Sequence, residues 1–88
     1  MNKEQIQELL RDERARRIFM QVVERRKVQH SEVQDASGLD SDETAEQLDR
    51  LEKAHLIKVQ PSSLRDFSIY YPTTEGLEAQ RRIQRSLF

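Results

Sequence analysis

The sequence lacks the residues that disulfide, thiolate-metal and membrane-spanning proteins require. Among its 88 residues there is no cysteine and no tryptophan, and only two glycines and two prolines. Without cysteine, neither a disulfide framework nor a thiolate metal site can form. No apolar run approaches the length of a membrane span, and the first residues have no apolar core typical of a signal peptide. We therefore expect a cytoplasmic protein of one compact domain.

The motifs of catalysis and metal binding are also missing. The sequence has no nucleophile elbow, no glycine-rich phosphate loop and no pair of acids in an evident apolar pocket. Its two histidines, His30 and His55, lie in separate predicted elements. We therefore expect no enzymatic activity, no bound metal and no cofactor.

Charged residues are abundant instead, at 35% of the chain, and their signs are unevenly distributed. Residues 1–30 carry eight bases and five acids, residues 31–56 two bases and eight acids, and residues 57–88 five bases and three acids. An acidic middle segment between basic ends is suited to self-association or to binding a charged partner.

Apolar periodicity predicts helices at about residues 3–10 and 12–27. The polar stretch RDERARR between their apolar groups leaves two possibilities open, one long helix or two helices that meet near Arg11 and Asp12. The first apolar group is Ile6, Leu9 and Leu10. Together with Leu87 and Phe88 it predicts either a dimer interface or simple burial within the monomer.

Two further helices are expected at residues 31–37 and 41–55, with recognisable ends. Ser31 and Gln34 fit a capping box at the first, and Gly38 suits a left-handed residue at its end. Asp40 and Glu43 fit a second box. The buried side of the longer helix is expected to hold residues at a spacing of three, namely Ala45, Leu48, Leu51 and Ala54.

After the helices the apolar period changes from 3.6 to 2, which predicts a hairpin with strands 56–60 and 67–71. In the second strand, Phe67, Ile69 and Tyr71 alternate with Ser68 and Tyr70. Pro72 ends this strand, and a threonine at 73 or 74 caps a last helix over 74–86. This order predicts an α+β winged helix-turn-helix domain at 12–88, preceded by a helical extension at 1–11.

Two junctions resemble those of the MarR- and ArsR-like winged-helix regulators. The segment LDRLEKAHLI at 48–57 is similar to their "L-x-x-L-E-x-x-G-L-I", and YYPTTEGL at 70–77 is similar to "Y-x-L-T-x-x-G". The resemblance implies a cytoplasmic transcriptional regulator that binds duplex DNA, as a homodimer through its terminal helices. His55 stands where the pattern has glycine, so a left-handed residue there would be strained by about 1–2 kcal/mol.

On this interpretation the helix 41–55 enters the major groove and the wing 61–66 lies along the DNA backbone. The expected contacts are made by hydroxyl, amide and guanidinium groups: Ser41, Thr44, Gln47, Arg50 and Arg65. The outward face of that helix, however, carries five acids and two bases. This charge favours an alternative function, in which the acidic helix docks on the basic surface of another protein.

Overall fold

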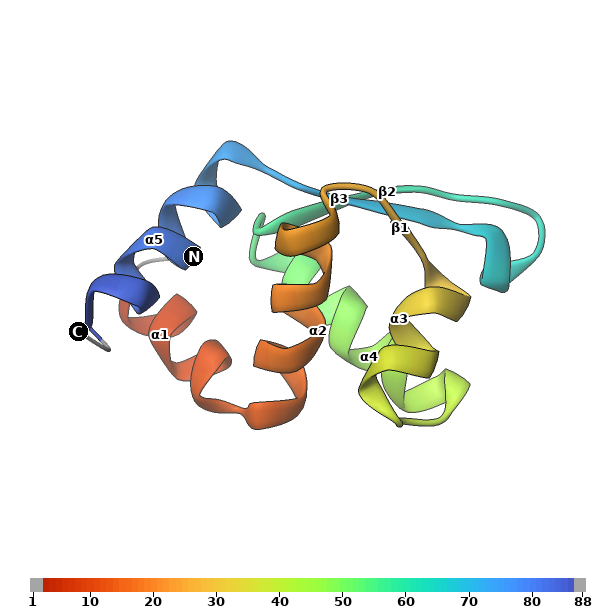
Figure 1. Cartoon of the computed structure of the whole chain (residues 1–88), viewed down its shortest axis with the longest axis horizontal. Helices are drawn as coiled ribbons and strands as arrows, with labels where there is room; N and C mark the ends of the chain where they lie inside the picture. Colours follow the sequence, from red (N-terminus) through yellow and green to blue (C-terminus); the bar gives the residue numbers. More distant parts are fainter. Residues whose placement is uncertain (1–2, 87–88) are drawn as a thin grey trace.

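The computed structural model describes residues 3–86, which form five α-helices and three strands around one hydrophobic core (Figure 1). In chain order the elements are α1 Lys3–Arg11, α2 Glu13–Arg25, β1 Val28–Gln29, α3 His30–Ser37, α4 Ser41–Lys53, β2 Ile57–Gln60, the 3-10 turn η1 Arg65–Phe67, β3 Ile69–Pro72 and α5 Thr74–Ser86. No helix among these described residues is both long and apolar enough to cross a bilayer.

The N-terminal segment forms two helices, which settles the question that the sequence left open. Asp12 separates them and caps α2, because its carboxylate accepts the backbone N–H of Arg14 at 3.0 Å. Leu9 and Leu10 of α1 are buried in the core of the same chain. They are therefore not available for a dimer interface, and Leu87 and Phe88 lie outside the described residues.

The helix-turn-helix forms as expected, with one correction. The capping box predicted at Ser31 and Gln34 is wrong, because α3 begins at His30 and the carboxylate of Glu32 accepts the N–H of Gln29 at 3.1 Å. Gly38 ends α3 in the left-handed region at φ 74°, as predicted. Asp40 caps α4 by accepting the N–H of Glu43 at 2.8 Å, also as predicted.

The buried side of α4 is wider than the predicted stripe. Leu48, Leu51 and Ala54 are buried as expected, but Ala45 is only half-buried. Thr44 and Gln47 are buried instead, with 0% and 1% of their surface exposed. Thr44 and Gln47 lie four residues before Leu48 and Leu51 and therefore share their face of the helix, which packs against α2 and α3.

The sheet is antiparallel with strand order β1-β3-β2, and the sequence did not predict β1. Tyr70 of the central strand lies opposite Val28 of β1 and Val59 of β2. In the second hairpin strand Ser68 and Tyr70 are buried, whereas Phe67 is exposed and Ile69 and Tyr71 are half-buried, so the predicted alternation does not mark the inward face. A shift of one residue exchanges the two faces of a strand, and η1 removes Phe67 from the strand altogether.

The start of α5 is fixed against the end of α4. His55 is left-handed at φ 61°, and the N–H of Leu56 donates to the carbonyl of Leu51 at 3.1 Å, as in a Schellman end. Thr73 donates its hydroxyl to the His55 carbonyl at 2.6 Å and accepts the N–H of Gly76 at 2.9 Å. A Cβ atom at Gly76 would overlap the Leu56 carbonyl, which explains glycine at this junction.

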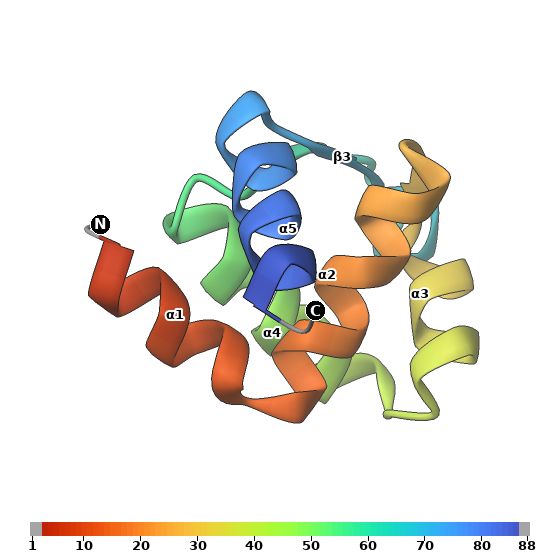
Figure 2. The same cartoon turned by 60° about the vertical axis from the view of Figure 1, so that its left-hand side comes forward.

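The two ends of the molecule are built from different elements. In Figure 1 the helices α1 and α5 lie at one end, and the β2–β3 hairpin extends toward the opposite end. Figure 2, turned to bring the first end forward, shows α1, α2 and α5 gathered there. The hairpin loop therefore lies away from the terminal helices, whereas the C-terminal end of α4 contacts the start of α5.

Candidate nucleic-acid interface

The start of α4 and the hairpin loop meet through a direct side-chain contact. Arg65 of η1 donates from Nη1 to the Asp42 carboxylate at 2.9 Å and to the Ser41 hydroxyl at 3.2 Å. Both side chains of this ion pair are largely exposed, so it adds only about 0–1 kcal/mol to stability. Two of the predicted contact residues, Ser41 and Arg65, are thus brought together at one accessible corner.

Two other predicted contact residues lie in the interior. Thr44 and Gln47 are almost fully buried, contrary to the expectation that they face a partner. Neither side chain reaches the surface unless α4 moves away from its neighbours. The prediction failed because both residues are polar, and polarity assigned them to the exposed face.

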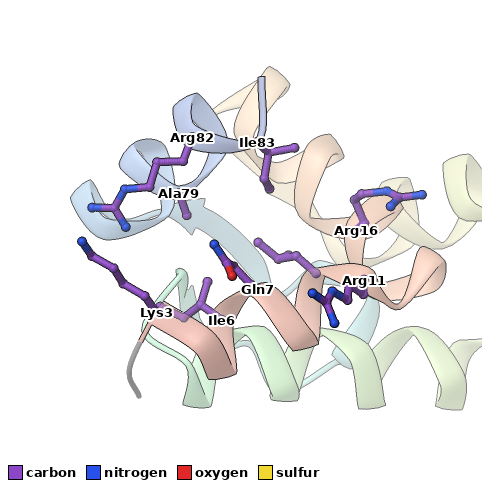
Figure 3. A pocket seen from close by; sticks show the side chains of 9 residues that line it. Lys3, Ile6, Gln7, Arg11, Arg16, Ala79, Arg82 and Ile83 are labelled. Atoms are coloured by element: carbon purple, nitrogen blue, oxygen red, sulfur yellow. The ribbon is translucent and has the colours of Figure 1, made fainter. Parts of the chain in front are cut away.

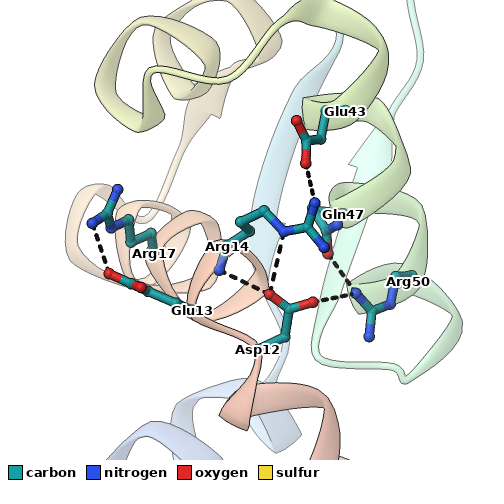
Figure 4. A network of polar contacts seen from close by, with 7 residues as sticks. All are labelled: Asp12, Glu13, Arg14, Arg17, Glu43, Gln47 and Arg50. Carbon is teal, nitrogen blue, oxygen red and sulfur yellow. Dashed lines mark hydrogen bonds and ion pairs between the residues drawn. The ribbon is translucent and has the colours of Figure 1, made fainter.

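The fifth predicted residue, Arg50, is held at the α1–α2 junction (Figure 4). Its Nη1 donates to Asp12 Oδ2 at 2.9 Å and to Gln47 Oε1 at 2.7 Å. The hydrogen bond from Arg50 is the main reason that the pKa of Asp12 falls from its usual 3.8 to about 2. Arg14 completes the network by pairing with both Asp12 and Glu43 of α4. The sequence did not reveal this network, since Asp12 and Arg50 are 38 positions apart.

The outward side of α4 is acidic, as the sequence predicts. Asp42, Glu46, Asp49 and Lys53 are all exposed, and their spacing places them on one stripe along the helix. Lys53 pairs with Asp49 at 2.9 Å, so its charge is already engaged. We call Asp42, Glu46 and Asp49 the acidic stripe. A phosphate that approached α4 along this stripe would meet net negative charge.

The hairpin loop is apolar at its tip. Among the described residues the exposed large hydrophobic side chains are Leu64 and Phe67, with 60% and 54% of their surface accessible. They flank Arg65, which is the only base in the predicted wing 61–66, and Asp66. We call residues 64–67 the wing tip. Within residues 3–86, no three histidine or acidic side chains come together in a way that could hold a metal ion.

Solved structures with this arrangement are winged-helix proteins. A transcriptional regulator homologue from Pyrococcus horikoshii superposes with a TM-score of 0.79 at 23% identity, over 91% of this chain and 81% of that one. TubR from Bacillus thuringiensis, bound to 24 bp of tubC, superposes with a TM-score of 0.78 at 15% identity, over 98% of this chain and 96% of TubR. A mutant of MarR from E. coli, complexed with operator DNA, superposes with a TM-score of 0.73 at 13% identity, over 84% of this chain and 53% of MarR. The α+β winged-helix fold expected from the sequence is confirmed.

The similarity is one of fold. The chain spans about half the length of MarR. No protein-family model and no curated protein matches the sequence.

Proposed function

We propose that this protein is a cytoplasmic, DNA-binding transcriptional regulator, in which α4 enters the major groove and the wing lies along the backbone. The observation that carries the proposal is the corner where Ser41 at the start of α4 meets Arg65 of the wing. Helix N-termini, hydroxyl groups and guanidinium groups are the groups that bind phosphate and base edges. The winged-helix neighbours MarR and TubR, both solved with DNA, support it.

Ser41 and Arg65 are the contacts that we propose from the predicted set, and Arg50 is a third if it leaves Asp12. Arg65 already donates to Asp42, so DNA has to compete with that acid for the guanidinium group. The acidic stripe opposes the approach of phosphates. We therefore expect binding to be weaker than in a winged helix with a basic face, and to decrease only modestly with added salt, because Arg65 and Arg50 are the only cations among the proposed contacts.

Charge reversal on the acidic stripe tests this proposal. Glu46 is exposed near the middle of the stripe. Glu46→Lys should tighten binding to duplex DNA by about tenfold, since one phosphate repulsion becomes an attraction. Gel-shift titration at low salt measures this change in affinity. Non-specific affinities typically lie at ~10⁻⁴–10⁻⁶ M, so absence of any shift at about 100 µM protein would exclude the proposal.

A matched variant separates a local effect from a change of net charge. Glu78 is exposed on α5, at the far end of the molecule from the wing. Glu78→Lys makes the same change of charge and should alter DNA binding much less than Glu46→Lys. Equal effects of the two substitutions would show that α4 does not face the DNA.

The acidic stripe favours a second candidate, a winged helix that docks on the basic surface of another protein. Glu46→Lys distinguishes the two candidate functions, because it should weaken binding to a basic protein partner and tighten binding to DNA. A homodimer through the terminal helices also belongs to the proposal, since recognition of paired half-sites requires two copies of α4. The mass of the protein in solution tests that part.

A further inference from the structure

The terminal helices enclose a cavity that the proposed DNA contact does not use. It has a volume of about 440 Å³ and lies between α1, α2 and α5 (Figure 3). Ile6, Leu10, Ala79 and Ile83 contribute its apolar surface. The volume falls within the roughly 300–1,000 Å³ typical of sites that bury a ligand, so it can hold an aromatic side chain.

The rim of this cavity is basic. Lys3 and Arg11 of α1, Arg16 of α2 and Arg82 of α5 line it, and none of the residues that line it within 3–86 is acidic. Figure 3 shows these side chains reaching around the cavity from the three helices. Four cations around an apolar centre select an occupant that is both apolar and negatively charged.

The opposite end of the molecule has the complementary chemistry. The wing tip exposes Leu64 and Phe67, with the exposed carboxylate of Asp66 between them in sequence. Arg65 of the wing tip is paired with Asp42, so Asp42, Arg65 and Asp66 together leave one net negative charge beside the apolar side chains. An apolar projection beside acids on one copy therefore matches an apolar cavity with basic residues around it on another.

We propose that the wing tip of one copy inserts into the terminal-helix cavity of a second copy. Phe67 and Leu64 would occupy the apolar centre, while Asp66 and Asp42 face the cationic rim. The contact joins two different surfaces and is therefore heterologous, unlike a helix-to-helix homodimer with two-fold symmetry. It would cover the corner formed by Ser41 and Arg65, so self-association and the proposed DNA contact would compete.

An interface built around one projecting tip is small, so association should be weak and transient. We expect sedimentation velocity at increasing protein concentration to show growth above monomer mass in the range of about 0.1–1 mM. The association should weaken at 0.5 M salt, because the Debye length there is only a few ångströms.

Two variants and one control test the contact. Leu64→Ser with Phe67→Ser removes the apolar tip and should weaken association by about tenfold or more, since burial of each side chain contributes to it. Arg82→Glu reverses one charge at the rim of the cavity and should weaken association by a similar factor. Arg81→Glu changes the neighbouring exposed arginine, which does not line the cavity, and should leave association unchanged. Circular dichroism and the thermal midpoint verify that each variant is folded.

A mixture of the wing variant and Arg82→Glu distinguishes a heterologous contact from a symmetric one. Each variant alone lacks one half of the contact, but the wing variant keeps an intact cavity and Arg82→Glu keeps an intact wing tip. Mixing them should restore association as one-to-one pairs, which is a property of heterologous contacts alone.

Three outcomes would overturn the proposal. Wild-type protein that stays monomeric up to about 1 mM would show that the wing tip does not enter the cavity of a second copy. A wing variant that associates as strongly as wild type would show that the contact lies elsewhere. Failure of the mixture to associate would show that wing tip and cavity do not meet.

Discussion

At the scale of single residues, His30 stands out because it is fully buried and its ring has no hydrogen-bond partner among the described residues. Its Nδ1 is 3.9 Å from the Asp66 carboxylate, and its ring lies beside that of Tyr70. Burial is the main cause that lowers the pKa of His30 below its usual 6.5, and the charge of Arg65 lowers it further, while Asp66 opposes both. The folded protein therefore holds His30 neutral at neutral pH.

This histidine should make stability depend on pH. Because the folded-state pKa lies below that of the unfolded chain, the unfolded chain binds a proton first as pH falls below about 6.5. The contribution to stability is present above that pH and is lost as pH falls toward the folded-state pKa. We expect the free energy of unfolding, measured in urea, to decrease between pH 7.5 and 5.5 in wild type and to decrease less in His30→Phe.

The second histidine provides the control. His55→Gln removes the other histidine and leaves His30 in place, so a decrease that comes from His30 should persist in this variant. Equal decreases in wild type, His30→Phe and His55→Gln would show that His30 is not responsible.

The buried positions of Thr44 and Gln47 show where prediction from sequence stops at this scale. A polar residue on a helix is normally assigned to solvent, and that rule outweighed the helical spacing here. Thr44 and Gln47 lie four residues before Leu48 and Leu51, so all four share one face of the helix. That face is covered because α4 packs against both α2 and α3, and residue polarity alone does not reveal this packing.

At the scale of elements, most helix ends were predictable because caps are local, although the box expected at Ser31 and Gln34 does not form. Asp40, Gly38 and Thr73 act where the sequence indicates, within three residues of the groups that they bind. β1 was not predictable, because a strand of two residues has no periodicity and exists only through its pairing with β3. The register of β3 failed for the same reason, since its inward face is chosen by both neighbouring strands.

The junction between α4 and α5 leads to a prediction that contrasts the two glycines. A methyl group at Gly76 would overlap the Leu56 carbonyl, whereas a methyl group at Gly38 meets no atom within 4 Å. We expect Gly76→Ala to lower the free energy of unfolding by about 3 kcal/mol, because the backbone must shift. Gly38→Ala should lower it by about 1 kcal/mol, from its left-handed backbone alone.

Chemical denaturation of the two variants compares them directly. A larger loss in Gly38→Ala than in Gly76→Ala would show that α5 does not approach Leu56 as closely as described. It would also remove the physical reason for glycine at this junction.

At the scale of the whole molecule, one core joins every element from α1 to α5. Leu51 is fully buried in it. Leu51→Ala should cost about 2–5 kcal/mol, a large share of the ~5–15 kcal/mol available to a small domain. Leu64→Ala, at the exposed wing tip, removes the same atoms and should change stability by less than about 0.5 kcal/mol.

Thermal unfolding of both variants tests this single core. We expect one cooperative transition in each, with a lower midpoint only for Leu51→Ala. Loss of half the structure in a separate early transition would contradict a continuous core.

The order of the strands has a mechanical consequence. The segment that contains α3 and α4 leaves the sheet after β1 and returns to it at β2, and both of these strands pair with β3. The strands on both sides of the helix-turn-helix are therefore hydrogen-bonded to the same strand, β3. A force on the hairpin, such as that from a bound molecule, acts through β3 on both ends of the helix-turn-helix. The hairpin and these helices should therefore move together as one rigid body.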